Sequence, residues 1–346
     1  MRDQRSKKEN SSMTKLIVLS DCLSSNHSFW IRIGQYLKRL GNEFNITITD
    51  DRRLIEQLDA GDKLILYRYS LDWGDIGNQL IKAKIKGVTI ISDVDDYLWN
   101  DGENRGWPKQ RLRLYSKSLR HCHFITCSTS ELKEQIEVMY REAKVILFKN
   151  TAPPVITDKS IVSDNKIRFG WTGAPWTRPY DLQDVKLLGK WVEKNKERAE
   201  IIHIGHSERE ISLAEVIGID EDVVKKIALR EYDEYTKKFN FDVGLAPLKH
   251  SCFNSYKSAI KVIEYSANSI PGIASDTSVY RGLCREWAWD GRLCKTEEDW
   301  IKHAVDLLDA YKRLKEGKIL KEKCEKYAPN EMGIRNWRKI LQQQDN

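Results

Sequence analysis

The sequence alternates short apolar runs with longer amphipathic segments, and this pattern constrains the fold more than any other feature of the chain. In the first half, the apolar runs predict strands over residues 15–19, 44–49, 63–67, 88–92, 124–127 and 144–147. The segments between them predict helices over 29–40, 52–58, 74–86, 109–119 and 130–140. Because short strands separated by helices of about 10–15 residues form βαβ units, we expect a parallel sheet covered by helices.

The same alternation restarts after a polar segment that contains Pro153 and Pro154. Here the apolar runs predict strands over residues 167–170, 200–204, 241–246 and 272–275. The intervening segments predict helices over 181–195, 211–216, 231–239, 256–267 and 298–316. Two open α/β sheets in one chain form a cleft when they face each other, and ligands bind at the carboxyl ends of such strands. The predicted fold class is therefore α/β, with two Rossmann-like domains facing across a cleft.

The length of the chain agrees with two domains, since 346 residues is about twice the ~150-residue size typical of one core. We predict a disordered leader, an N-terminal domain, a linker and a C-terminal domain over residues 1–13, 14–150, 151–166 and 167–327, respectively. A last helix near residues 331–342, within 328–346, is expected to pack back on the first domain.

Composition excludes several classes of protein. No apolar run approaches the ~18 residues of a membrane span, and the N-terminus has no apolar core of a secretory signal. The seven cysteines include no CxxC pair, which favours reduced thiols in the cytoplasm over a disulfide framework or a zinc site. The formal net charge of +7 suits anionic ligands or an anionic membrane surface. The sequence lacks the dense basic patch with stacking aromatics that would indicate nucleic-acid binding.

The most informative stretch is 241–280, where a strand of small apolar residues leads through a loop into a helix. Asn254 or Ser255 can cap that helix, and Lys257, Lys261 and Glu264 follow at spacings that share one face. A helix N-terminus with two lysines is an anion site suited to a diphosphate, and a carboxylate further along can accept ribose hydroxyls. The alternative is a solvated polar helix face with a lysine–glutamate pair.

A second stretch, 168–182, runs from a strand into a loop with Gly173, Arg178 and Asp181. Glycine lets backbone N–H groups approach a phosphate closely, and an arginine can clamp it. Asp181 is most simply the N-cap of the following helix.

Together these stretches resemble the nucleotide-sugar glycosyltransferases of the GT-B fold, specifically the group-1/family-4-like enzymes of bacterial polysaccharide assembly. The matching segments are RFGWTGAP with a following DL, IIHIGH, FDVGLAPL, FNSYKSAIKVIEYSANSIPGIAS with Tyr280, and SDVDDYLW. The resemblance implies that Glu264 holds the donor ribose and that the Gly173 loop faces the donor phosphates. It places Lys257, Ser258 and Lys261 at the donor diphosphate, and Asn254 is a further candidate for donor binding. The family has a second glutamate eight residues before the first, and this sequence has Tyr256 there, which leaves the donor sugar open.

An acidic cluster of Asp93, Asp95 and Asp96 follows the strand over 88–92. Read alone, it is a DxD motif of the kind that binds a divalent metal in single-domain transferases. The resemblance instead puts these acids in the acceptor-side domain, with Asp95 as a candidate for catalysis. His27, in the loop after the first strand, is the second catalytic candidate. An acidic loop that caps the next helix is the other interpretation.

A basic segment over residues 109–123 interleaves arginines and lysines with leucines and Tyr115. It fits either an anionic membrane surface, a lipid-linked pyrophosphate acceptor, or an ordinary solvated helix.

The sequence thus predicts a glycosyltransferase that moves a sugar from a nucleotide-diphospho-sugar to a hydroxyl of a glycan or lipid-linked glycan. The resemblance implies retention at the anomeric carbon, with no metal and no cofactor. We expect a cytoplasmic enzyme, either free or in contact with the inner face of the membrane. The alternatives are a non-catalytic protein that binds a nucleotide or glycan, a metal-dependent DxD transferase, and a phosphorylase or epimerase of the same fold.

Overall fold

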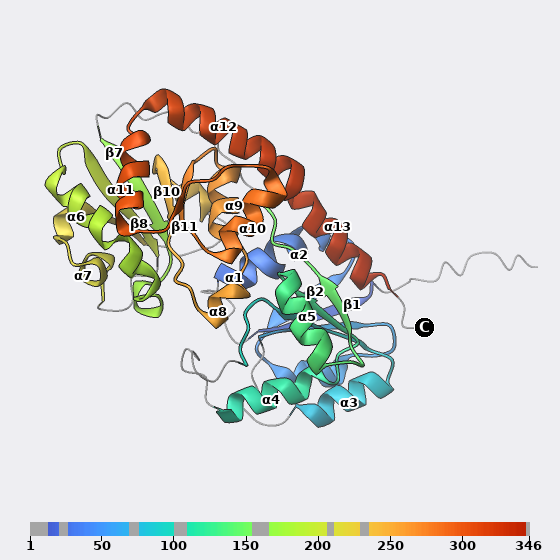
Figure 1. Ribbon diagram of the computed structural model, residues 1–346. Coiled ribbons are helices and arrows are strands. Elements are labelled where there is room, and N and C mark those ends of the chain that lie inside the picture. Colours follow the sequence, from blue (N-terminus) through green and yellow to red (C-terminus); the bar gives the residue numbers. More distant parts are fainter. Residues whose placement is uncertain are drawn as a thin grey trace, which may run out of the picture.

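The computed structural model describes residues 13–20, 27–68, 76–99, 109–153, 166–205, 211–228 and 235–343. These residues form two six-stranded parallel sheets, one from each half of the chain (Figure 1). Most of the predicted leader and residues 154–165 of the predicted linker lie outside the described residues.

The first sheet has the strand order β2-β1-β3-β4-β5-β6. Its strands are β1 (Lys15–Ser20), β2 (Asn45–Thr49), β3 (Lys63–Tyr67), β4 (Thr89–Val94), β5 (Phe124–Cys127) and β6 (Lys144–Leu147). The helices between them are α1 (His27–Phe29), a π-helical turn (Trp30–Gly34), α2 (Gln35–Leu40), a 3-10 turn (Arg52–Gln57), α3 (Gly77–Ile85), α4 (Lys109–Leu119) and α5 (Ser130–Met139). The order reverses between β1 and β3, which is where such sheets bind ligands.

The second sheet has the strand order β12-β11-β10-β7-β8-β9. Its strands are β7 (Ile167–Thr172), β8 (Ala199–Gly205), β9 (Val224–Ala228), β10 (Val243–Ala246), β11 (Gly272–Ser275) and β12 (Leu293–Cys294). Its longer helices are α6 (Lys186–Lys194), α7 (Leu213–Ile217), α8 (Cys252–Ser255), α9 (Ile260–Ala267), α10 (Ser278–Trp287), α11 (Glu297–Asp306) and α12 (Ala310–Tyr327). Short 3-10 turns lie at Pro175–Thr177, Asp181–Val185, Glu221–Val223 and Thr236–Lys238. This is the order of a dinucleotide-binding sheet.

The central strands of both sheets are buried on both faces, as in parallel sheets covered by helices, whereas the edge strands β2 and β9 are largely exposed. In β1, residues from Leu16 to Ser20 are all buried, so an uninterrupted apolar run replaces the alternation of a half-exposed strand. One apolar core packs α3, α4 and α5 on one face of the first sheet, and another packs α2 and α13 (Asn330–Leu341) on the other face.

The end of the chain returns to the first domain (Figure 1). Helix α12 lies along the second domain, and α13 places Ile334, Trp337, Ile340 and Leu341 in the core beside β1 and α2. The Trp337 Nε1–H donates to the Arg32 carbonyl oxygen at 2.9 Å. The predicted domain boundaries themselves stay a prediction. Among the described residues, no helix is both long and apolar enough to cross a membrane.

The predicted α/β class is confirmed, and four strands and α4 have the predicted bounds. The predicted single helix over 298–316 is wrong, because the chain leaves the helix after Asp306. Asp309 then caps α12 by accepting N–H groups of Tyr311 and Lys312, which starts a new helix. Three elements were not predicted: strands β9 and β12 and helix α10. The two strands lack a clear apolar run, because β9 is only half-buried and β12 is two residues long.

Candidate active site

A cavity of about 340 Å³ lies between the two domains, at the carboxyl ends of strands from both sheets. Nine of the residues singled out in the sequence line it: His27, Asp95, Asp96, Gly173, Arg178, Lys257, Ser258, Lys261 and Glu264. Parallel topology explains this convergence, because the ends of strands distant in sequence meet at one edge of a sheet. Asp93 and Asn254, also singled out, are not part of the cavity wall.

The loop after β7 forms one wall of the cavity. Gly173 has a φ of +144°, a backbone conformation that favours glycine. Its carbonyl oxygen lies 2.9 Å from Nε2 of His203 at the end of β8. Burial lowers the pKa of His203 to about 4, so at neutral pH the ring is uncharged and can donate to this carbonyl. A Cβ on Gly205 would overlap the same oxygen, so close packing fixes the path of the loop.

The predicted helix over 256–267 is wrong in its first turn. The chain forms α8 after the N-cap Ser251, breaks, and starts helix again at Ile260 in α9. One cause of the break is a contact from the first domain: Thr129 Oγ1 donates to the Tyr256 carbonyl oxygen at 2.9 Å, which takes an acceptor that a continuous helix would use. Lys257 therefore lies in the connection before α9, and not on the same helix face as Lys261.

Lys261 lies in the first turn of α9, with its amine turned toward the end of β7. Its Nζ donates to the carbonyl oxygen of Thr172, and to Oγ1 of the same residue at 3.0 Å. The amine also lies 5.3 Å from the centre of the Trp171 ring, within range of a cation–π contact. Burial lowers the pKa of Lys261 to about 7, an effect to which the nearby positive charge of Arg178 adds. At neutral pH the amine is therefore only partly charged, and a phosphate bound beside it would favour the charged form.

Glu264 is 1% exposed, which excludes the interpretation of this helix face as a solvated one. Its Oε1 lies 2.8 Å from Nε2 of His27, and its Oε2 accepts from the Tyr235 hydroxyl at 3.4 Å. The centroids of the His27 and Tyr235 rings lie 4.3 Å apart. His27 is the first residue of α1 and not a loop residue as predicted, and Tyr235 was not singled out in the sequence. The carboxylate is thus held at the floor of the cavity by one residue from each domain.

Arg178 and Asn254 are organised by the buried carboxylate of Asp181. Arg178 is partly exposed and lies 3.5 Å from Asp181 Oδ2. The Asn254 side-chain amide and the Lys249 backbone N–H donate to Asp181 Oδ1 at 2.9 and 3.0 Å. Asp181 therefore connects the loop before α8 to the Gly173 loop. The prediction that Asp181 caps the following helix is wrong. Asn254 thus supports the cavity wall through Asp181 and does not line the cavity itself, in contrast to its expected place beside the donor.

The acidic cluster divides into a residue held in the core and two residues that line the cavity. Asp93 is completely buried and accepts from Arg32 Nε at 3.0 Å, Arg32 Nη2 at 2.6 Å and Thr126 Oγ1 at 2.6 Å. Its expected place on the acceptor side of the cavity is therefore corrected: the pair with Arg32 holds it in the core. Only Asp95 and Asp96 line the cavity.

Asp95 and Asp96 share a partner that the sequence analysis missed. Arg68 directly follows β3; its Nε donates to Asp95 Oδ1 and its Nη2 to Asp96 Oδ2, both at 2.6 Å. Burial raises the pKa of Asp95, and the charge of Asp96 adds to this effect. Burial acts in the same direction on Asp96, but Lys257 and Arg68 outweigh it and hold the Asp96 pKa below its ordinary value. The position of Arg68 at a strand end was the available signal.

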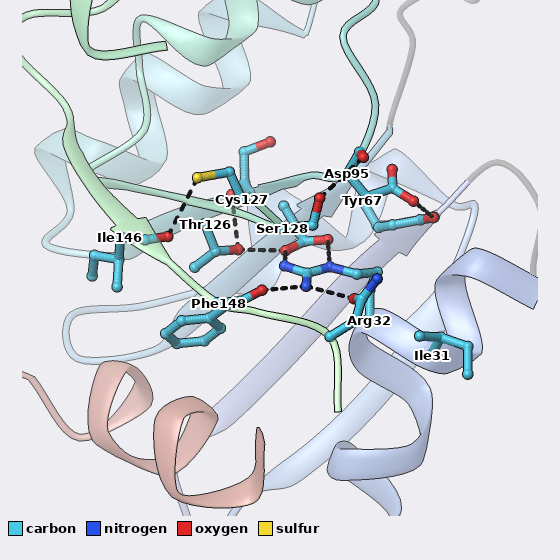
Figure 2. Close-up of polar contacts among 12 residues, drawn as sticks. Ile31, Arg32, Tyr67, Asp95, Thr126, Cys127, Ser128, Ile146 and Phe148 are labelled. Atoms are coloured by element: carbon cyan, nitrogen blue, oxygen red, sulfur yellow. Dashed lines mark hydrogen bonds and ion pairs between the residues drawn. The ribbon is translucent and has the colours of Figure 1, made fainter. Parts of the chain in front are cut away.

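Arg32 connects this wall to the crossing between the domains. Its Nη1 donates to the Phe148 carbonyl oxygen and to Asn150 Oδ1, the latter at 2.9 Å (Figure 2). The Asn150 side-chain amide in turn donates to Ser258 Oγ at 2.6 Å. Hydrogen bonds thus run from the first sheet through the interdomain crossing to the connection before α9, and they tie the two domains together beside the cavity. Neither Arg32 nor Asn150 was singled out in the sequence.

The described residues contain no group of three His, Cys, Asp or Glu side chains arranged to hold a metal ion. The expectation of a metal-free site and the DxD alternative both stay hypotheses about the reaction.

Neither a family model nor a curated protein matches the sequence significantly. Solved structures do match. TarM of S. aureus has a TM-score of 0.60 at 13% identity over 84% of this chain and 57% of its own. The pneumococcal O-GlcNAc transferase GtfA, solved with UDP and GlcNAc, has a TM-score of 0.58 at 15% identity over 84% of this chain and 58% of its own.

A third structure matches over nearly its whole length. The UDP-forming trehalose-phosphate synthase of Burkholderia xenovorans has a TM-score of 0.63 at 11% identity, over 96% of this chain and 99% of its own. This chain thus spans just over half of TarM and GtfA but almost all of the synthase. At such identities the similarity concerns architecture alone, and it confirms the predicted one: the protein has the GT-B fold of two Rossmann-like domains facing across a cleft.

Proposed function

We propose that the protein is a glycosyltransferase that moves a sugar from a nucleotide-diphospho-sugar to a hydroxyl of a glycan or lipid-linked glycan. The observation that carries this proposal is the shared cavity, in which cations of the second domain face carboxylates of the first. GtfA, which has a similar fold, was solved with UDP and GlcNAc, and this supports a nucleotide sugar as the donor.

The second domain supplies the groups that a donor needs. Lys257, Lys261 and Arg178 surround the N-terminus of α9, whose first N–H groups have no partner inside the helix. These groups stabilise the negative charge that grows on the departing diphosphate, which is the main electrostatic demand of glycosyl transfer. The fixed carboxylate of Glu264 accepts the two ribose hydroxyls, and the Gly173 loop offers backbone N–H groups to the phosphates.

The first domain presents the acceptor. The bond from the anomeric carbon to the diphosphate oxygen breaks, the bond to the acceptor oxygen forms, and the acceptor proton passes to the departing diphosphate. Asp95 and His27 position the acceptor hydroxyl at the anomeric carbon, and Asp96 lies beside them. We assign retention at this carbon and no metal requirement, on the family resemblance.

A thermal-shift screen with UDP-, GDP-, dTDP- and ADP-sugars tests the proposal. We expect one nucleotide class to raise the melting temperature, and the purified protein to transfer or slowly hydrolyse that donor. Absence of binding to all of these donors would overturn the proposal. EDTA treatment tests the metal-free assignment: loss of activity that Mn²⁺ restores would support the DxD alternative.

A second candidate function is binding without turnover, and the position of Tyr256 favours it. Tyr256 stands where the family has an acid, but its ring stacks on Tyr97 at 4.3 Å and is not part of the cavity wall. The donor sugar therefore lacks that carboxylate. Binding of a nucleotide sugar with no transfer, hydrolysis or isomerisation would support this candidate, and any turnover of the donor would dismiss it.

We further propose that the protein contacts an anionic membrane through α3 and α4. The two helices pack side by side on the first sheet (Figure 1). Their exposed basic residues are Lys82, Lys84, Lys86, Lys109, Arg113, Lys117 and Arg120, and neither helix contains an acid. Ile85 is 80% exposed among them, as a residue that enters a bilayer surface would be. Co-sedimentation with phosphatidylglycerol vesicles but not phosphatidylcholine vesicles is expected, and an Arg113→Glu/Lys117→Glu variant should lose it.

A further inference from the structure

One ion pair joins the two domains inside the cavity. Nζ of Lys257, in the connection before α9, lies 2.8 Å from Oδ1 of Asp96, which follows β4. The Lys257 side chain is 10% exposed and that of Asp96 is 17% exposed. Water therefore screens the pair only weakly, and its attraction is much stronger than that of a surface salt bridge.

This pair engages a cation that the proposed function assigns to the donor. Lys257 shares the cavity with Lys261 and Arg178, the other two cations of the donor wall. A carboxylate and a phosphate are both anionic acceptors of charge-assisted hydrogen bonds. Without a ligand, Asp96 thus stands at Lys257 in the role that a phosphate oxygen takes in the donor complex.

Arg68 keeps Asp96 paired when Lys257 leaves it. Its Nη2 donates to Asp96 Oδ2, the oxygen that Lys257 does not contact, while its Nε holds Asp95. Arg68 has a φ of +40°, an uncommon conformation for a non-glycine residue, which aims its side chain at both acids. Loss of Lys257 therefore does not leave Asp96 as an uncompensated buried charge, which would be strongly unfavourable.

We propose that Asp96 competes with the incoming ligand for Lys257, so that an anion gains this lysine only when it binds the lysine more strongly than Asp96 does, as a diphosphate would. This inference rests on the proposed function, because it concerns the same donor site. A ligand gains Lys257 only by replacing an existing ion pair. A diphosphate carries more charge and can also reach Lys261 and Arg178, whereas a monophosphate carries less charge to offset the lost pair.

Calorimetry with inorganic pyrophosphate and inorganic phosphate tests this role. We expect Asp96→Asn to bind pyrophosphate more tightly by about tenfold and phosphate by no more than that, because the anion that displaces Asp96 in the wild type recovers the whole cost of the broken ion pair. Asp222→Asn is the matched control, because it removes one acid that is 61% exposed and distant in sequence from the site. In an Asp96→Asn/Lys257→Met variant the gain should disappear.

Carboxyl labelling of the wild-type protein, with a carbodiimide and an amine, needs no substitution at Asp96. Saturating pyrophosphate should raise the labelling of Asp96 and leave that of Asp222 unchanged. Equal anion affinities of Asp96→Asn and Asp222→Asn, or unchanged labelling of Asp96, would overturn the inference while nucleotide-sugar binding upheld the proposed function. If neither wild type nor Asp96→Asn bound a nucleoside diphosphate or pyrophosphate, both would fall.

Discussion

The two walls of the cavity carry opposite charge and are built in different ways. The wall from the second domain presents Lys257, Lys261 and Arg178, and the wall from the first domain presents Asp95 and Asp96. The basic wall is complementary to the diphosphate of a donor. Arg68 pairs with both of these acids, so this wall offers a diphosphate little attraction and suits a neutral hydroxyl acceptor. The charges of the two walls thus assign the donor diphosphate to one wall and the acceptor hydroxyl to the other, independently of any contact with the sugar.

Glu264 and His27 are the exceptions that make the comparison useful. Glu264 is an acid on the basic wall, and its contact with His27 brings the first domain to the floor of the donor site. If the walls have separate tasks, substitutions in each should change different measured quantities. A substitution at Asp95, which has no contact with a cation of the basic wall, should lower turnover, and basic-wall variants should weaken donor binding.

The largest effect is expected at Asp95, on the acidic wall. Asp95→Asn should lower the transfer rate by about 100-fold, because it removes the charge that positions the acceptor, while nucleoside-diphosphate affinity stays within about twofold. Steady-state transfer and calorimetry measure the two quantities. Asp59→Asn, which changes an exposed acid, is the control. A loss of nucleotide affinity as large as the loss of rate would show that the walls do not act separately.

Glu264→Gln should weaken binding of a nucleoside diphosphate by about 30-fold, since a neutral amide accepts the ribose hydroxyls less strongly. Pyrophosphate, which has no ribose, should bind the variant as it binds the wild type. Glu331→Gln, on the exposed face of α13, is the matched control. If both ligands lost affinity equally, Glu264 would be a structural support of the α9 N-terminus and not a ribose acceptor.

Lys261→Ala should lower transfer and nucleoside-diphosphate affinity by at least about tenfold, because it deletes one charge-assisted contact with the diphosphate. In contrast to Glu264→Gln, it should weaken pyrophosphate to the same degree. Lys196→Ala removes an exposed lysine from the same domain and controls for net charge. Unchanged affinity for the nucleoside diphosphate would exclude Lys261 from the donor site.

The basic wall could be read from the sequence because most of it comes from one continuous stretch. Lys257, Ser258, Lys261 and Glu264 are close neighbours in the chain, so they lie near one another even though the helix begins only at Ile260. The prediction of one continuous helix over 256–267 was wrong where a tertiary contact overrides the local helical preference. The bond from Thr129 to the Tyr256 carbonyl separates α8 from α9, and nothing near Tyr256 in the sequence indicates it.

The acidic wall was harder to predict because its members come from separate strand ends. Arg68, Asp95 and Asn150 follow three different elements, and only packing of the sheets shows that they meet. The sequence also could not distinguish Asp93 from Asp95. Asp93 lies within β4 and Asp95 directly follows it, and Arg32 reaches Asp93 from the helical segment after β1 and holds it in the core.

The smallest expected effect is a pH dependence that separates the basic wall from the acidic one. Burial lowers the pKa of Lys261 from about 10.5 in an exposed lysine to about 7, so at pH 8 the free protein holds it mostly neutral. A bound diphosphate favours the charged amine, and binding should therefore take up a proton. The charged groups around the amine are Arg178, Glu264, Asp181 and Lys257.

From pH 7.5 to 8.5 the affinity for a nucleoside diphosphate should fall about fivefold, as linkage requires when the complex binds more protons than the free protein. Calorimetry in buffers of different ionisation enthalpy measures this uptake directly. Lys261→Arg stays charged throughout and should show no uptake. The free energy of unfolding should respond in the opposite direction: between pH 7 and 10.5 the unfolded chain binds more protons at this lysine, so its contribution to stability rises with pH. Equal proton uptake by wild type and Lys261→Arg would place the titrating group elsewhere and leave Lys261 without a role in charge recognition.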